Sequence, residues 1–301
     1  MHASLDSRAR WTAPLAALVL AGCSAIQLAY DNVDWFLVER ADYYLDLDTE
    51  QRRRAEKLVA ARMEVHRREE LPEYVDTLIE IRAMLADNLT PAEVEIIKER
   101  IPALYRRTMR DTVPGIASLL VEIDDAQIDH LASRIDERNR EFREKFMQTS
   151  LESRLDARVE RSRRMIEFFV GDLREDQLAL VRVRRNAMPL TADSWLAYHE
   201  VRQQALLVLL RERASREELE AFLIAWWVEL AGKPPDLERR MDRTQREWSA
   251  MMLELDKTLD ADQRKELLDT LDTFIVELGA LVPSKQARRQ GDPSSVDDDI
   301  L

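Results

Sequence analysis

The chain has 301 residues, of which 46% are hydrophobic and 34% charged, and its formal net charge is −13. Nonspecific nucleic-acid binding depends on basic patches that displace counterions, so this acidic chain is expected to have no nucleic-acid partner. A single cysteine excludes disulfides within the chain and zinc sites built on several thiolates. Only 6 glycines and 10 prolines stand beside many charged and aliphatic residues, which predicts an all-α fold.

The first 22 residues have the layout of a secretory signal. Arg8 and Arg10 give a positive start, an apolar run follows over 13–20, and the small residues Ala21 and Gly22 come next. This pattern predicts cleavage between Gly22 and Cys23. The apolar run is shorter than the roughly 20 residues that cross a bilayer.

The segment Leu20-Ala21-Gly22-Cys23 resembles the lipobox of bacterial lipoproteins. The resemblance implies that Cys23 is lipidated and becomes the first residue, so the membrane is reached through lipid. Ser24 follows Cys23 where inner-membrane lipoproteins commonly carry Asp, which implies an outer-membrane location facing the periplasm. A plain signal peptide and a short buried helix are the alternatives. If Cys23 is lipidated, residues 23–34 are expected to link the lipid to the protein body.

A helical domain is expected over 35–283, with a sub-boundary near 188–191. Apolar residues recur at helical spacing, as in Tyr74, Leu78, Ile81 and Leu85. Helix starts share a capping pattern, in which a cap side chain accepts a backbone N–H and a Gln or Glu three residues later reaches back. The copies begin at Asp48, Thr90, Asp124, Ser215 and Asp260, with a weaker one at Arg174.

One long helix is predicted from about Asp125 to Val170, because 55 residues between Gly115 and Gly171 contain neither Gly nor Pro. At 1.5 Å per residue it would be about 65 Å long. We therefore expect an elongated multi-helix bundle with one long central helix. The tail 284–301 is polar and acidic, which is typical of disorder.

Two family resemblances concern the domain itself. The nearest matches to the Leu-Thr-x-x-Gln motif of Spy/CpxP-type periplasmic chaperones begin at Leu47, Leu89 and Leu259, and none is complete. A longer resemblance runs through Tyr30–Trp35, Asp42–Gln51 and His66–Tyr74, and is to an uncharacterised family of Gram-negative helical lipoproteins. It implies an all-helical lipoprotein and assigns no activity.

The segment His66-Arg67-Arg68-Glu69-Glu70 is the first candidate site. His66 and Glu70 lie one turn apart, as a metal or acid–base site would place them, but metal ligands come in spaced clusters and a second histidine is missing. We expect neither metal nor cofactor. His66, Arg67 and Glu70 are instead expected to brace a helix corner at Pro72 through hydrogen bonds and carboxylate pairs.

Aromatic and basic stretches have both structural and functional interpretations. Trp35, Tyr43 and Tyr44 are expected to pack in the core, with an interfacial aromatic belt as the alternative. Trp226 and Trp227 are also expected in the core, with an exposed client contact as the alternative. The arginines between 154 and 164 alternate with acidic residues and are interpreted as a solvated ion-pair face.

No catalytic motif is present in the sequence, so we predict a protein that is not an enzyme. The expected function is that of an outer-membrane-anchored, periplasm-facing lipoprotein that binds envelope proteins, in a chaperone-like or assembly role. The alternatives are a structural subunit of an envelope complex and, more remotely, an envelope hydrolase. The sequence leaves the oligomeric state open.

Overall fold

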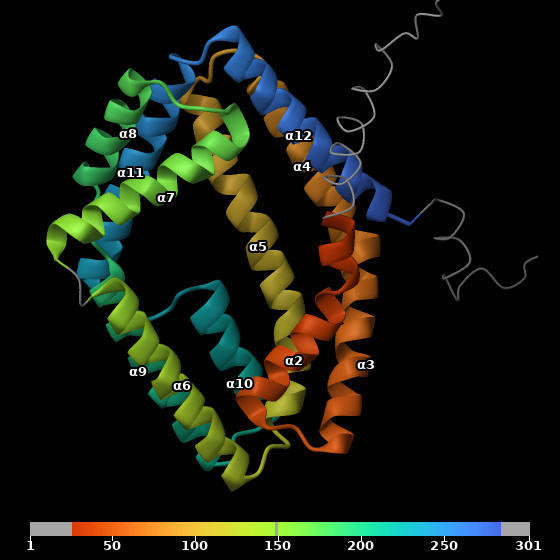
Figure 1. Cartoon of the computed structure of the whole chain (residues 1–301). Helices are drawn as coiled ribbons and strands as arrows, with labels where there is room; N and C mark the ends of the chain where they lie inside the picture. Colours follow the sequence, from red (N-terminus) through yellow and green to blue (C-terminus); the bar gives the residue numbers. More distant parts are fainter. Residues whose placement is uncertain (1–25, 148–149, 284–301) are drawn as a thin grey trace, which may run out of the picture.

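The computed structural model describes residues 26–147 and 150–283, and these residues form helices and turns with no strand among them. The predicted all-α fold is confirmed. The signal region, Gly22, Cys23 and the tail 284–301 lie outside the described residues. In chain order the helices are α2 Val33–Leu45, α3 Thr49–Val65, η1 His66–Glu70, α4 Leu71–Met84, α5 Pro91–Leu120, α6 Asp125–Phe146, α7 Leu151–Val170, α8 Glu175–Ala187, α9 Ala192–Arg211, α10 Arg216–Leu223, η2 Ile224–Val228, α11 Pro235–Asp256 and α12 Ala261–Leu281 (Figure 1).

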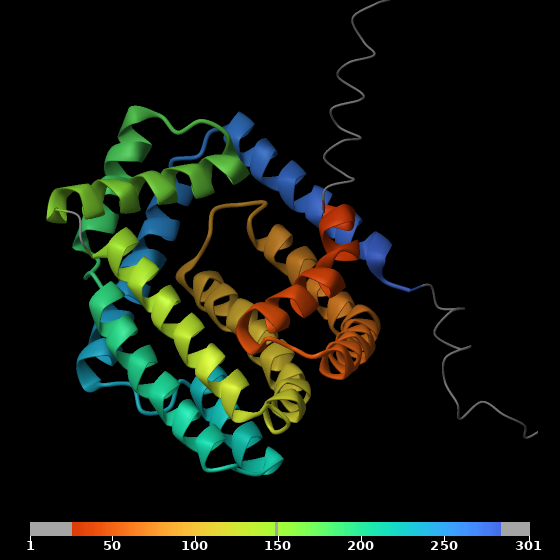
Figure 2. The ribbon, with the colours of Figure 1, turned by 60° about the horizontal axis from the view of Figure 1, so that its bottom comes forward.

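The helices surround α5, which is the longest at 30 residues (Figure 1). α5 contacts α3, α4, α10, η2 and α11, while α2 packs against α3 and α6, and α12 packs against α4 and α7. Figure 2 shows the remaining helices as a frame around α5 and its neighbours. The largest apolar core joins α5, α6, α9, α10 and η2 through buried residues such as Val113, Leu131, Leu207 and Leu223.

Two pairs of capping glutamines join helix starts that are far apart in the sequence. Gln51 and Gln127 exchange side-chain amide hydrogen bonds of 3.1 and 2.6 Å, and Gln177 and Gln263 exchange bonds of 2.8 and 2.9 Å. The first pair holds α3 to α6 and the second holds α8 to α12, at opposite ends of the molecule in Figure 1.

The capping boxes expected at Asp48, Thr90, Asp124, Ser215 and Asp260 are confirmed. At Arg174 only half of the box forms, because Gln177 accepts the Arg174 N–H at 3.0 Å while an arginine side chain has no acceptor to return.

The prediction of one helix from Asp125 to Val170 is wrong. α6 ends at Phe146 and α7 begins at Leu151, and the two helices run in different directions (Figure 1). Ser150 is the N-cap of α7, where its hydroxyl accepts the Ser153 N–H at 3.2 Å. A serine cap can start a new helix without any Gly or Pro, so the absence of helix breakers did not guarantee continuity. α5 is instead the long central helix.

The expectation that Trp35 packs in the core is also wrong. Trp35 is 64% exposed and Phe36 56% exposed, so the outer side of α2 does not pack in the core, whereas Tyr44 packs against the largest core. The arginines between 154 and 164 are mostly exposed or half-buried, as expected of a largely solvated face, and Arg158 is the buried exception. Among the described residues, no helix combines the length and the low charge needed to cross a membrane.

Candidate binding cavity

A cavity of about 650 Å³ lies between α5 and the helices packed around it. Its wall is mainly aliphatic and aromatic, with a few polar side chains. The lining residues are Leu37, Arg40, Ala41, Tyr44 and Leu45 of α2; Ala55, Leu58, Val59 and Arg62 of α3; Asp111, Thr112, Gly115, Ile116, Leu119 and Leu120 of α5; Leu131 and Ile135 of α6; Gln203 and Leu206 of α9; and Trp226 and Trp227 of η2.

Gly115 supplies an open position in this wall. A Cβ built at Gly115 would meet no heavy atom within 4 Å beyond its own helix neighbourhood. Because the residue sits within the helical run of α5, the missing side chain there enlarges the cavity rather than permitting an unusual turn.

The polar part of the wall leads to a buried carboxylate. Glu70 is 1% exposed, and its Oε1 lies 2.5 Å from Nη2 of Arg62, a cavity-lining side chain. Thr108 donates its hydroxyl to Glu70 Oε2 at 2.6 Å. The single hydroxyl proton of Thr108 is used in this bond. Tyr74 is therefore the donor in the 2.5 Å contact between its hydroxyl and Thr108 Oγ1. The network joins α3, η1, α4 and α5.

His66 lies at the edge of the same network. Its Nδ1 is 2.8 Å from the Tyr30 hydroxyl, and its Nε2 is 3.9 Å from Glu70 Oε2. Burial lowers the pKa of His66, with Arg62 and Arg67 adding to the effect and Glu70 opposing it. Burial also raises the pKa of Tyr30, so this phenol keeps its proton. Arg67 stacks on the Tyr30 ring, 5.2 Å from its centroid.

A π-helical turn produces this arrangement. Over His66–Glu70 the chain makes a wider turn, and the Leu71 N–H donates to the carbonyl of His66, five residues earlier. Pro72 follows and has no N–H to donate to the preceding turn. Turns of this kind are frequent at functional sites. The wide turn therefore ends directly before Pro72, with Glu70 buried, while Arg67 forms no ion pair with a carboxylate of the described residues.

A second π-helical turn places two tryptophans on another wall of the cavity. Trp226 is 6% exposed and Trp227 is half-buried, within η2. The Trp226 indole N–H donates to Nδ1 of His199 at 3.3 Å. Burial lowers the pKa of His199, which keeps this nitrogen available as an acceptor.

The structure thus brings His66, Arg67 and Glu70 together behind the cavity-lining Arg62, and it places Trp226 and Trp227 on the cavity wall itself. Sequence reasoning missed Arg62 and the cavity. Arg62 stands four residues before His66, which was a usable signal, but the cavity is formed by segments from 37 to 227 that only the fold brings together. Among the described residues, no group of three His, Cys, Asp or Glu side chains is arranged to hold a metal ion.

The model of a family of unknown function, DUF6279, matches residues 43–226. The chain belongs to this family. The DUF6279 match runs from Tyr43 in α2 to Trp226 in η2, so it contains the Glu70 network and most of the cavity wall. No curated protein and no solved structure matches the chain.

Proposed function

We propose that this protein is an outer-membrane-anchored, periplasm-facing lipoprotein that binds an apolar part of an envelope protein in the cavity, without catalysis. The lipobox-like segment ending at Cys23 supports the anchoring. The cavity supports the binding, and it is the observation that carries this proposal. Its volume of about 650 Å³ and its mainly apolar, aromatic lining are those of a binding site rather than of a packing defect.

The buried carboxylate also favours binding over hydrolysis. A general acid or base needs an oxygen that reaches the substrate. Glu70 is 1% exposed, its Oε2 accepts a hydrogen bond from Thr108, and its Oε1 forms an ion pair with Arg62 but accepts no hydrogen bond among the described residues. The network therefore holds three helices in position around the cavity and leaves the apolar wall as the part that meets a partner.

A site-specific crosslinking experiment tests this proposal. A photoreactive amino acid replaces Ile116, which lines the cavity, or Val208, which is 50% exposed on α9 and serves as the control position. The native lipidated protein is irradiated in cell envelopes and its adducts are identified by mass. We expect adducts with envelope proteins from position 116 that are lacking from position 208.

Filling the cavity provides the matched control. Gly115→Leu directs a side chain into the open position, whereas Gly279→Leu places the same residue in α12, where a Cβ also meets no atom within 4 Å. The adducts at 116 should disappear with Gly115→Leu and persist with Gly279→Leu. One dominant partner would indicate a dedicated complex, and many unfolded clients would indicate a chaperone. Equal adducts in both variants would refute the cavity as the binding site.

A further inference from the structure

Four arginines gather where α7 packs on α8, away from the cavity. None of the four forms an ion pair with a carboxylate among the described residues. We name them the arginine cluster: Arg154, Arg158 and Arg161 on α7, and Arg185 on α8.

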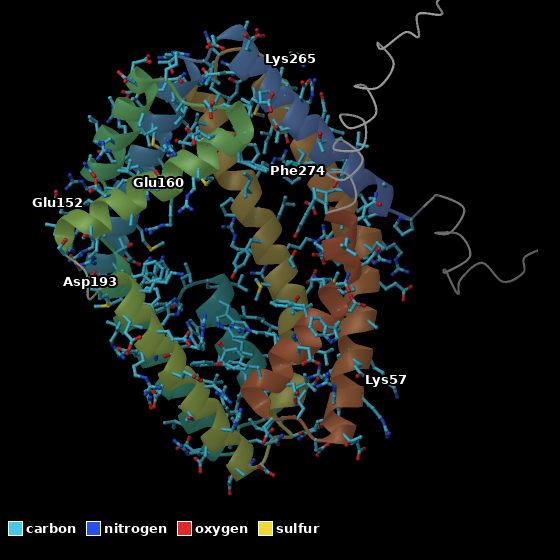
Figure 3. All side chains as sticks on the ribbon, in the orientation of Figure 1. Lys57, Glu152, Glu160, Asp193, Lys265 and Phe274 are labelled. Carbon is cyan, nitrogen blue, oxygen red and sulfur yellow. The ribbon has the colours of Figure 1, made fainter. Side chains whose placement is uncertain are left out.

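Helical geometry explains why the acidic residues of α7 do not neutralise the cluster. At about 100° per residue, positions 154, 158 and 161 fall on one face of α7 and positions 152, 156 and 160 on the opposite face. Asp156 pairs with Arg182 at 3.0 Å, and Glu160 pairs with Arg163 at 3.1 Å and Arg164 at 3.7 Å. Figure 3 labels Glu152 and Glu160 on α7 and Asp193 at the start of α9. Asp193 pairs with Arg240 at 3.6 Å.

Arg158 is the most buried member of the arginine cluster, at 7% exposed. Its Nη1 donates to the carbonyls of Met188 and Pro189 at 3.0 and 3.3 Å, where α8 ends. Its Nε and Nη2 are buried and have no hydrogen-bond partner among the described residues. Nη1 of this guanidinium is therefore hydrogen-bonded within the protein, whereas the N–H groups of Nε and Nη2 have no acceptor among the described residues.

Arg185 of α8 has a smaller deficit, because its Nη1 donates to the Met188 sulfur at 2.8 Å. Its Nε is buried without a partner in the described part of the chain, and its guanidinium stacks 5.1 Å from the centroid of Trp248. Burial, followed by the charges of Arg158 and Arg161, lowers the pKa of Arg185 to about 10. Arg185 thus remains cationic at neutral pH, and no carboxylate among the described residues pairs with it or with Arg158.

We propose that the arginine cluster is a binding site for an oxyanion of the phosphate class. Buried cations without a partner are costly, and guanidinium forks match the acceptor geometry of phosphate oxygens. Arg158 and Arg185 form the base of the site. The exposed Arg161 and half-buried Arg154 leave it open to solvent. The oxyanion could be carried by a free phosphate or by a phospholipid headgroup, because the chemistry recognised is the same.

Calorimetric titration of the full chain in detergent without phosphate distinguishes these sources. One arm uses inorganic phosphate, and the other uses short-chain phosphatidylglycerol, with short-chain phosphatidylcholine as a zwitterionic comparison. We expect saturable binding of one ligand per chain with inorganic phosphate, with phosphatidylglycerol, or with both. Binding of inorganic phosphate assigns a free oxyanion, and binding of phosphatidylglycerol alone assigns a headgroup.

Matched variants locate the site on each helix. Arg161→Gln and Arg185→Gln should weaken binding at least tenfold, whereas Arg164→Gln on α7 and Arg182→Gln on α8 remove arginines that already have carboxylate partners and should leave it unchanged. The thermal midpoint in buffer alone checks that each variant is folded. The proposal is overturned if neither phosphate nor phosphatidylglycerol binds, or if all four variants bind alike. Both results are independent of the crosslinking at position 116.

Discussion

At the scale of single residues, the difference between Gln and Glu in a capping box decides whether two helices are joined. Either side chain can accept the N–H of its own cap residue. Only Gln also carries an amide N–H that can donate to a neighbouring helix start. Gln127 uses this donor on both the Asp46 carbonyl, at 2.9 Å, and Gln51. Glu93 and Glu218 complete their boxes locally.

We expect Gln127→Glu to lower the free energy of unfolding by about 1–3 kcal/mol, because a buried carboxylate would then face the Asp46 carbonyl and the Gln51 side chain without a donor to offer. Glu93→Gln and Glu218→Gln are the controls and should change stability by less than about 0.5 kcal/mol, since their boxes make no such bridge. Urea denaturation measures both effects. Equal losses in all three variants would show that the bridge adds nothing to the cap.

At the scale of helices and turns, η1 shows how one proline shapes a buried ion pair. The wide turn before Pro72 brings Glu70 against Arg62 of α3 and Thr108 of α5. A buried ion pair contributes little net stability, but removing one partner leaves the other charge buried without compensation, which destabilises the fold. The network therefore specifies how α3, α4 and α5 meet more than it adds to the free energy of folding.

Glu70→Leu should destabilise the protein by about 3 kcal/mol, because Arg62 would be left buried without its carboxylate. The double variant Arg62→Met/Glu70→Leu should recover most of the loss, since no charge then remains to be stranded. Arg107→Met removes a surface arginine that pairs with Glu73 and should cost less than about 1 kcal/mol. Thermal melts of the native protein and the three variants give the comparison, and a double variant no more stable than Glu70→Leu would contradict this account.

The helices and turns also show which features of the fold could be predicted from the sequence. Local signals sufficed for the helical class and five capping boxes, because each depends on residues within one turn. The break before α7 was missed because Ser150 starts a helix as readily as a breaker ends one. The burial of Arg158 could not be predicted, because it depends on the end of α8, whose Met188 and Pro189 carbonyls accept from it. The cavity escaped prediction because its wall comes from six separated segments.

At the scale of the whole molecule, the two glutamine pairs and the Glu70 network fix the frame of helices around α5 at three separate places. The lipid anchor that we propose would attach at the N-terminal side, before α2. This helix lines the cavity with Leu37 and Tyr44 and exposes Trp35. A partner entering the cavity would thus contact the element of the described chain that follows the anchor.

The stability of the whole fold should depend on pH through two half-buried histidines. Burial lowers the pKa of both His66 and His199 in the folded state. The unfolded chain, with a histidine pKa of about 6.5, therefore binds more protons than the folded chain below that pH. Their contribution is complete above about pH 6.5 and is lost as the pH falls toward the lowered folded pKa values. We expect the free energy of unfolding to fall between pH 7 and pH 5.

Replacing both histidines tests this origin of the pH dependence. His66→Gln/His199→Gln should be less stable at pH 7, because the contacts with Tyr30 and Trp226 are changed, but its stability should vary less between pH 7 and pH 5. His130→Gln alters a histidine on the outer side of α6 that contacts the Tyr43 carbonyl, and it should keep the slope of the native protein. Urea denaturation at closely spaced pH values measures the slopes. An unchanged slope in the double variant would assign the pH dependence to carboxylates instead.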